Sequence, residues 1–254
     1  MISAGQLAML ILIGVIGHVM ALIWYLADKR RLELCQDRIY DLPITDKQVR
    51  RELRNSIHTP IHAVLLYGCL LLGSFQNTSW LSFVLSLALT FIWAEIWHYV
   101  SHRLFHIPQL HWIHAEHHRS RLNSPVTAIS FSFTEKLVFD AGILGALVLL
   151  DLLYSLNFYG IAAWYVGYLI INSFSHANYE IKSRSFHRFS GKVLTSATYH
   201  ALHHSRYTGN YGLGTRFMDR LLKTEWDDYV PLYEQIKGAR KPLTHLKERA
   251  EKST

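Results

Sequence analysis

Residues 80–118 read WLSFVLSLALTFIWAEIWHYVSHRLFHIPQLHWIHAEHH. The first half, Trp80 to Tyr99, is almost uninterrupted apolar sequence with Glu95 as its one acidic residue. A helix of about 20 apolar residues crosses a bilayer core of ~30 Å. The second half is rich in histidine. This stretch therefore predicts a transmembrane helix that ends in a cluster of metal-binding side chains.

Four other apolar runs accompany this one. Three have spanning length or nearly so, Leu7–Ala27, Leu137–Leu156 and Phe158–Phe174, and Ile61–Phe75 is shorter. Leu7–Ala27 lacks a basic segment before it and has Lys29-Arg30-Arg31 after it, which predicts an uncleaved anchor rather than a signal peptide. We expect an all-α integral membrane helical bundle of four to five transmembrane segments, with a cytoplasmic helical cap that carries the histidines.

The basic residues predict the orientation of this bundle. All 26 Lys and Arg lie in 29–54, in 103–136 or from 182 onward. If the apolar segments cross, these stretches share one face, and the positive-inside rule assigns that face to the cytoplasm. We expect a multi-pass protein of the endoplasmic reticulum or a bacterial inner membrane with its active site on the cytoplasmic face. A basic face beside anionic lipid accounts for the net charge of +7, so no nucleic acid partner is expected.

The chain is expected to divide into three parts. Residues 1–56 form the anchor helix and a basic cytoplasmic loop, 57–230 form the membrane-embedded domain, and 231–254 form a basic tail, in which 237–252 is expected to be solvated or to lie on the surface. Cys35 and Cys69 lie far apart in the sequence, which excludes a disulfide framework and a CxxC zinc site.

The 16 histidines are concentrated near the predicted cytoplasmic ends of the helices. Residues at i, i+3 and i+4 share one helical face, so each H-x-x-H-H motif can direct three imidazoles at one point. Such motifs occur at 114–118 and 200–204, and an H-x3-H pair occurs at 102–106. HExxH and the Glu-x-x-His pattern of soluble di-iron bundles are absent. The pattern indicates a binuclear site of imidazole ligands, suited to Fe, Zn, Cu or Ni. Polar groups such as Glu95, Glu116, Asp219 or Asn178 are expected to orient the rings.

These motifs resemble the fatty acid hydroxylase/sterol desaturase superfamily of membrane di-iron oxygenases, from about Glu95 to Thr224. The shared elements are His102-Arg103-Leu104-Phe105-His106, His114–His118, His176-Ala177-Asn178, His200–His204, Asn210-Tyr211-Gly212 and Asp219-Arg220-Leu221. Lys47–Leu53 is similar to a stretch of lathosterol-oxidase-type desaturases. The chain departs from the family at Met218, at Leu222-Lys223 and at His98, where an aromatic residue is common.

The resemblance implies an O2-dependent hydroxylase or desaturase that acts on an unactivated C–H bond of a membrane lipid, sterol-like or fatty acyl. It implies two Fe ions, O2 as co-substrate and an external electron donor, either cytochrome b5 or ferredoxin with a reductase. The catalytic metal site would comprise His102, His106, His114, His117, His118, His200, His203 and His204, with His176 as a further ligand. Asn178 would orient a ligand or a metal-bound water, and His98 is expected to pack or cap rather than ligate.

Two other functions remain open at this point. A histidine-rich metal transporter would need polar ligands along a path at the membrane midplane, whereas here they gather at one face. A catalytically inactive relative could retain the fold as a lipid-binding or structural protein.

Overall fold

The computed structural model describes residues 2–250, and this part of the chain is helical with only isolated β-bridges. Its helices are α1 (Ala4–Lys29), α2 (Asp46–Asn55), α3 (Ile61–Leu71), α4 (Trp80–Phe105), α5 (His111–His118), α6 (Phe133–Tyr154), α7 (Phe158–Ser175), α8 (Arg184–Ser190), α9 (Ala197–Arg206), α10 (Phe217–Leu221) and α11 (Tyr229–Tyr233). The predicted all-α fold class is confirmed.

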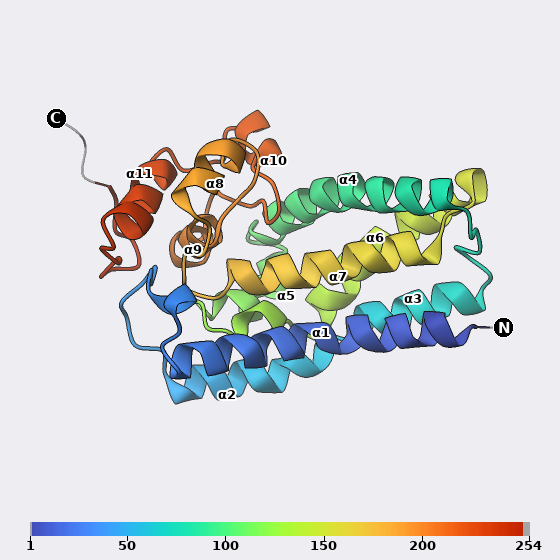
Figure 1. The fold of residues 1–254 in the computed structure, drawn as a ribbon, viewed down its shortest axis with the longest axis horizontal. Helices are drawn as coiled ribbons and strands as arrows, with labels where there is room; N and C mark the ends of the chain where they lie inside the picture. The colour runs from blue at the N-terminus through green and yellow to red at the C-terminus, as the bar shows by residue number, and fades with distance from the viewer. Residues whose placement is uncertain (1, 251–254) are drawn as a thin grey trace.

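The long helices form a bundle, most of the short helices gather at one end of it, and α3 lies toward the opposite end (Figure 1). Helix α7 packs against α1 and α4, while α6 packs against α3 and α4. Helices α8 to α11 form a cap at the end where α4 and α7 finish (Figure 1). The chain therefore brings the last turn of α4, the end of α7 and the cap helices to one place.

Three helices, α1, α4 and α6, are long and apolar enough to cross a membrane. Helix α3 has 11 residues, a length of roughly 16 Å, which is too short to cross by itself. Helix α7, with 18 residues, lies in the bundle but is not among the three. The sequence predicted four to five crossings; that number and the side of the membrane that the cap faces stay predictions.

Polar residues set the ends of the long helices. Ser3, Ser79, Ser132 and Asn157 are N-caps, and each side chain accepts a hydrogen bond from a backbone N–H of the first turn. At the end of the bundle away from the cap, the Asp151 carboxylate accepts from the backbone N–H groups of Phe75 and Leu156, at 3.0 and 2.6 Å. Asp151 thereby connects the turn after α3 to the turn after α6.

The described part of the predicted C-terminal tail packs onto the cap through a few apolar side chains, and most of residues 237–250 stay at least partly exposed. Its apolar side chains Leu232, Tyr233, Ile236 and Leu243 are buried with Ile39 and Tyr40. The backbone N–H of Leu243 donates to Ile39 O at 2.8 Å, and Asp41 N–H donates back to Leu243 O at 2.9 Å. The basic composition of this segment concealed an apolar face that closes the cap.

Gly160 marks the closest approach of α7 to α4 and gives a test of this packing. A Cβ at Gly160 would collide with the backbone oxygen of Phe83 and lie 2.9 Å from Ser86 Cβ, whereas a Cβ at Gly167 would meet nothing within 4 Å. We expect Gly160→Ala to lower the thermal unfolding temperature in detergent, because overpacking costs about 1–3 kcal/mol. Gly167→Ala on the same helix is the matched control and should be neutral or slightly stabilising. Equal unfolding temperatures for both variants would contradict this packing.

Candidate metal centre

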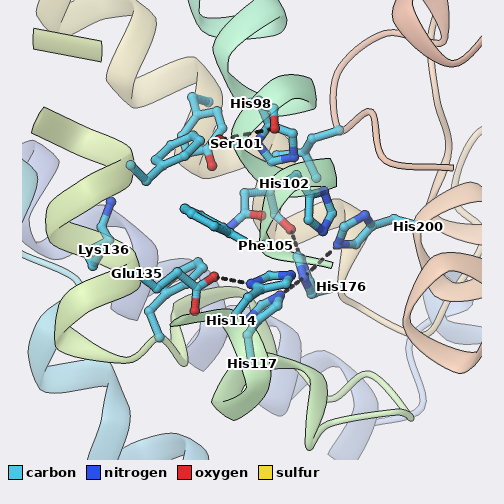
Figure 2. Close-up of a pocket in the computed structure, with 15 residues that line it drawn as sticks. His98, Ser101, His102, Phe105, His114, His117, Glu135, Lys136, His176 and His200 are labelled. Atoms are coloured by element: carbon cyan, nitrogen blue, oxygen red, sulfur yellow. Dashed lines mark hydrogen bonds and ion pairs between the residues drawn. The ribbon is translucent and has the colours of Figure 1, made fainter. Parts of the chain in front are cut away.

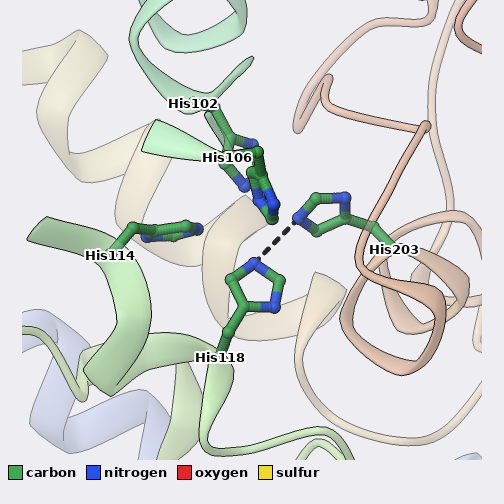
Figure 3. Close-up of side chains that lie close together, drawn as sticks. All are labelled: His102, His106, His114, His118 and His203. Carbon is green, nitrogen blue, oxygen red and sulfur yellow. Dashed lines mark hydrogen bonds between the residues drawn. The ribbon is translucent and has the colours of Figure 1, made fainter. Parts of the chain in front are cut away.

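The nine histidines predicted as ligands come together in two groups. The five-histidine group comprises His102, His106, His114, His118 and His203, and the four-histidine group comprises His117, His176, His200 and His204. Within each group, one potential ligand atom per residue lies within 4.8 Å of all the others. Figure 3 shows the rings of the five-histidine group turned toward a common centre, with residues from α4, α5 and α9 on different sides of it.

The two groups adjoin each other because α5 and α9 each contribute to both. In α5, His117 faces the four-histidine group, while His114 and His118 face the other. In α9, His203 belongs to one group and His200 and His204 to the other. The rings of His118 and His204 have their centroids 4.8 Å apart across the boundary. This arrangement fits two ions side by side.

Hydrogen bonds on the outer side of the rings fix which nitrogen faces inward. Five of the histidines place Nδ1 within hydrogen-bond distance of a backbone carbonyl. These pairs are His102 with Tyr211 O (2.8 Å), His117 with Ser130 O (2.9 Å), His176 with Asn172 O (2.8 Å), His203 with Gly209 O (2.8 Å) and His204 with Ser120 O (2.9 Å). A carbonyl can only accept, so Nδ1 carries the proton and Nε2 keeps its lone pair. Each of these rings therefore presents a metal-ligand atom to the centre.

The contacts among the inner nitrogens agree with a bound cation. His176 Nε2 lies 3.3 Å from His117 Nε2 and 3.2 Å from His204 Nε2. All three rings have their proton on Nδ1, so these pairs bring lone pair against lone pair. Two imidazole nitrogens bound to one ion at ~2.1 Å stand roughly 3.0–3.4 Å apart at ordinary coordination angles. The residues present thus fit a metal ion, and the donor set of imidazoles suits iron among other transition metals.

One carboxylate orients a ligand, and it is not one of those expected from the sequence. Glu135 Oε1 lies 2.6 Å from His114 Nδ1, and both side chains are buried. Glu135 is in the first turn of α6, where its backbone N–H donates to the N-cap Ser132. A Ser-x-x-Glu capping pattern at the histidine end of an apolar helix is the signal that could have identified it.

The acidic residues named from the sequence do not touch the histidine rings. Glu95 accepts from the backbone and hydroxyl of Thr215, and Glu116 pairs with Arg51 and Arg119. Asp219 acts on a ligand indirectly. It accepts a hydrogen bond from the backbone N–H of Tyr211 at 2.9 Å, and the carbonyl of Tyr211 accepts one from His102 Nδ1.

Asn178 lies at a different place from the one expected. Its side chain accepts from the N–H of Tyr40 at 3.0 Å and donates to Tyr40 O at 3.1 Å. Its φ of 58° is left-handed, a conformation that asparagine tolerates better than most residues. Asn178 thus fastens the segment after α1 to the turn that follows His176.

Glu52 of α2 is a second buried acid that the sequence did not single out. Its carboxylate accepts from the hydroxyls of Ser120 (2.6 Å), Thr127 (2.9 Å) and Ser124. These residues form the loop after α5, and the Ser120 carbonyl of that loop receives His204 Nδ1. Glu52 therefore fixes the position of one of the carbonyls that orient the ligands.

Burial keeps these imidazoles neutral. Desolvation lowers the pKa of His117 to about 4, partly offset by its hydrogen bond to Ser130 O. Burial also holds the pKa of His118, His200, His203 and His204 well below the usual value. A neutral imidazole is the form that binds metal, so burial prepares the site for an ion.

Comparison with known proteins agrees with this geometry. The family model described as fatty acid hydroxylase matches residues 87–224, which is more than half of the chain and includes all nine histidines. The chain belongs to the fatty acid hydroxylase family. The resemblance inferred from the histidine motifs is thereby confirmed.

Several curated fatty acid hydroxylase relatives align with the chain at low identity. Methylsterol monooxygenase erg25B of Aspergillus fumigatus is 32% identical over 142 residues, which is 55% of this chain and 47% of that protein. Very-long-chain aldehyde decarbonylase CER1 of Arabidopsis thaliana is 31% identical over 210 residues, 78% of this chain and 33% of that protein. Very-long-chain aldehyde decarbonylase GL1-4 of Oryza sativa subsp. indica is 28% identical over 162 residues, 60% of this chain and 26% of that protein. The chain spans less than half of the length of each of these relatives, and no solved structure matches it.

The lowered histidine pKa values predict how the metal-free protein responds to acid. Unfolded histidines bind protons below pH 6.5, whereas folded His117 does so only below about pH 4. Between these values the unfolded state binds more protons, so stability is full above about pH 6.5 and falls as the pH drops. We expect the chelator-treated protein to lose roughly 2 kcal/mol at pH 5 from His117 alone. Thermal unfolding followed by circular dichroism measures this, and an unfolding temperature that does not change between pH 7.5 and pH 5 would contradict it.

Proposed function

We propose that the chain is a membrane di-iron oxidoreductase that hydroxylates or desaturates a membrane lipid at an unactivated C–H bond with O2. The observation that carries the proposal is the pair of adjacent histidine groups, in which six of the nine rings have Nδ1 held from outside by a carbonyl or a carboxylate and so direct Nε2 inward. The alternative of a metal transporter has no comparable support, because these ligands are buried at one end of the bundle.

The histidines would hold two iron ions, one in each group. Bound iron would supply the activation of O2 and the oxidation of the lipid, and the names of the relatives, a methylsterol monooxygenase and aldehyde decarbonylases, fit an oxidative reaction on a lipid. The protein keeps the imidazoles neutral, directs Nε2 inward and fixes His114 through Glu135. These tasks need a rigid backbone around the site, which the buried hydrogen bonds of Glu52 and Asp219 supply.

The chain also provides a narrow apolar cavity beside the histidines, with Phe105, Phe131, Phe139 and Leu213 in its walls. Apolar walls exclude water from a reactive centre and accept a hydrocarbon. The cavity lies between α4, α6 and α7 and the histidine groups (Figure 2), so a lipid could enter from the bundle and reach the metal site.

Two electrons must come from an external donor, which we propose to be cytochrome b5 or a ferredoxin with its reductase. A surface hollow lined by Lys47, Arg50, Arg51, Arg54 and Arg119 lies beside the loop after α5. Its charge suits an acidic protein, and Arg51 within it donates to Ser120, whose carbonyl receives His204. These contacts support a docking site near the four-histidine group, on the face that we propose to be cytoplasmic.

Metal analysis of the purified, iron-reconstituted protein tests the proposal. We expect about two irons per chain in the wild type. His203→Ala removes a ligand of the five-histidine group and His200→Ala one of the four-histidine group, so each variant should lose at least one iron. His245→Ala is the matched control, because its side chain is exposed and far along the chain from both groups.

Iron stoichiometry by mass spectrometry, with O2 consumption measured on membranes that contain the electron donor, gives the readout. Full iron content in the His200→Ala and His203→Ala variants would rule out the proposed centre. Metal uptake into vesicles without O2 consumption would instead favour a transporter.

A further inference from the structure

His98 is a histidine at the metal end of the bundle that neither group uses. It precedes His102 by four residues on α4, which is about one helical turn, and their ring centroids are 5.1 Å apart. Both of its ring nitrogens are buried, and neither meets a hydrogen-bond partner among the described residues. A buried polar group without a partner costs about 1–3 kcal/mol, so the position of this ring calls for a ligand.

The surroundings of His98 place its ring in the wall of the apolar cavity. Figure 2 shows His98 at one end of the cavity, with His114 and His117 at the other. The rings of Phe139 and Tyr168 stand beside it, with centroids at 5.4 and 6.4 Å. These aromatic rings give neither nitrogen of His98 a hydrogen-bond partner. They would pack equally well against an apolar side chain such as phenylalanine at this position.

Three other polar side chains that line the cavity are already engaged. Ser101 Oγ donates to the carbonyls of Trp97 and His98, and Lys136 pairs with Asp140 at 2.7 Å. Asn172 donates to Ala128 O at 2.6 Å. His98 differs from these three, because both of its polar atoms remain available to whatever enters the cavity. Glu135 Oε2 also lacks a partner, but its carboxylate is tied to His114 through Oε1.

We propose that His98 is a specificity-determining residue that hydrogen-bonds an oxygen of the lipid substrate, a hydroxyl or a carbonyl. A neutral imidazole has one donor and one acceptor, so it can donate to a carbonyl or accept from an alcohol. The inference rests on the proposed function and narrows its substrate class to lipids with an oxygen close to the reacting carbon.

The size of the cavity supports this choice. Its volume of about 40 Å³ has room for a few non-hydrogen atoms, so the end of a lipid enters and the remainder stays outside. An oxygen bound at His98 is about one helical turn from His102, which leaves only a few bonds between it and a carbon beside the histidine groups. A substrate with its oxygen many carbons from the reacting position would leave His98 unpartnered.

The test compares binding of two probes, octadecan-1-ol and octadecane, to the full-length, metal-loaded protein in nanodiscs. They differ only in the oxygen, and saturation binding of radiolabelled probe needs no turnover. We expect the wild type to bind the alcohol about tenfold more tightly, the equivalent of one hydrogen bond in a buried site. His98→Phe should bring the ratio to about one, while His98→Asn, which keeps a donor and an acceptor, should retain part of the preference.

The unfolding temperature and metal content of each variant are measured in the same samples. A wild type that binds both probes equally, or neither, overturns the inference, as does a His98→Phe variant that keeps the preference for the alcohol. If the preference depends on His98 but the protein holds no iron, the inference stands and the di-iron function fails. If two irons bind and the preference does not depend on His98, the function stands and the inference fails.

Discussion

The candidate metal centre depends on hydrogen bonds that lie outside it. Backbone carbonyls of Ser120, Ser130, Asn172, Gly209 and Tyr211 each receive the Nδ1 proton of one histidine. Each bond decides the tautomer and the direction of one ring, and together they leave lone pairs facing inward at distances that fit a bound cation. The geometry of the centre therefore depends on where the fold positions these five carbonyl groups.

Distant parts of the chain cooperate in that placement. Glu52, on α2, holds the loop that carries Ser120, and Asp219, in the cap, holds the segment that carries Tyr211. For His114, the group that contacts Nδ1 is a carboxylate instead of a backbone carbonyl: it belongs to Glu135, at the start of a long apolar helix. Glu52 and Asp219 are buried and each accept several hydrogen bonds, so they stabilise the loops that carry these carbonyls. The directions of the histidine rings are thus set by residues that are not members of the two histidine groups.

The sequence predicts the helical bundle, and the nine histidines that it singles out lie together in the structure, because apolar runs and i, i+3, i+4 spacing are properties of a single helix. Contacts between different helices and loops could not be predicted from the sequence. Glu135 and Glu52 sit in ordinary capping and amphipathic patterns, and backbone carbonyls leave no trace in residue types. Asn178 lies within a shared motif yet bonds Tyr40, and the basic composition of the C-terminal segment concealed Leu243 and its neighbours, which complete the cap.

Anomalous diffraction from crystals of the iron-loaded protein, recorded on either side of the iron absorption edge, tests the central claim most directly. Two peaks are predicted, one among the Nε2 atoms of His102, His106, His114, His118 and His203 and the other among those of His117, His176, His200 and His204. A single peak, or iron bound through Nδ1 with the outer carbonyl bonds broken, would contradict the account.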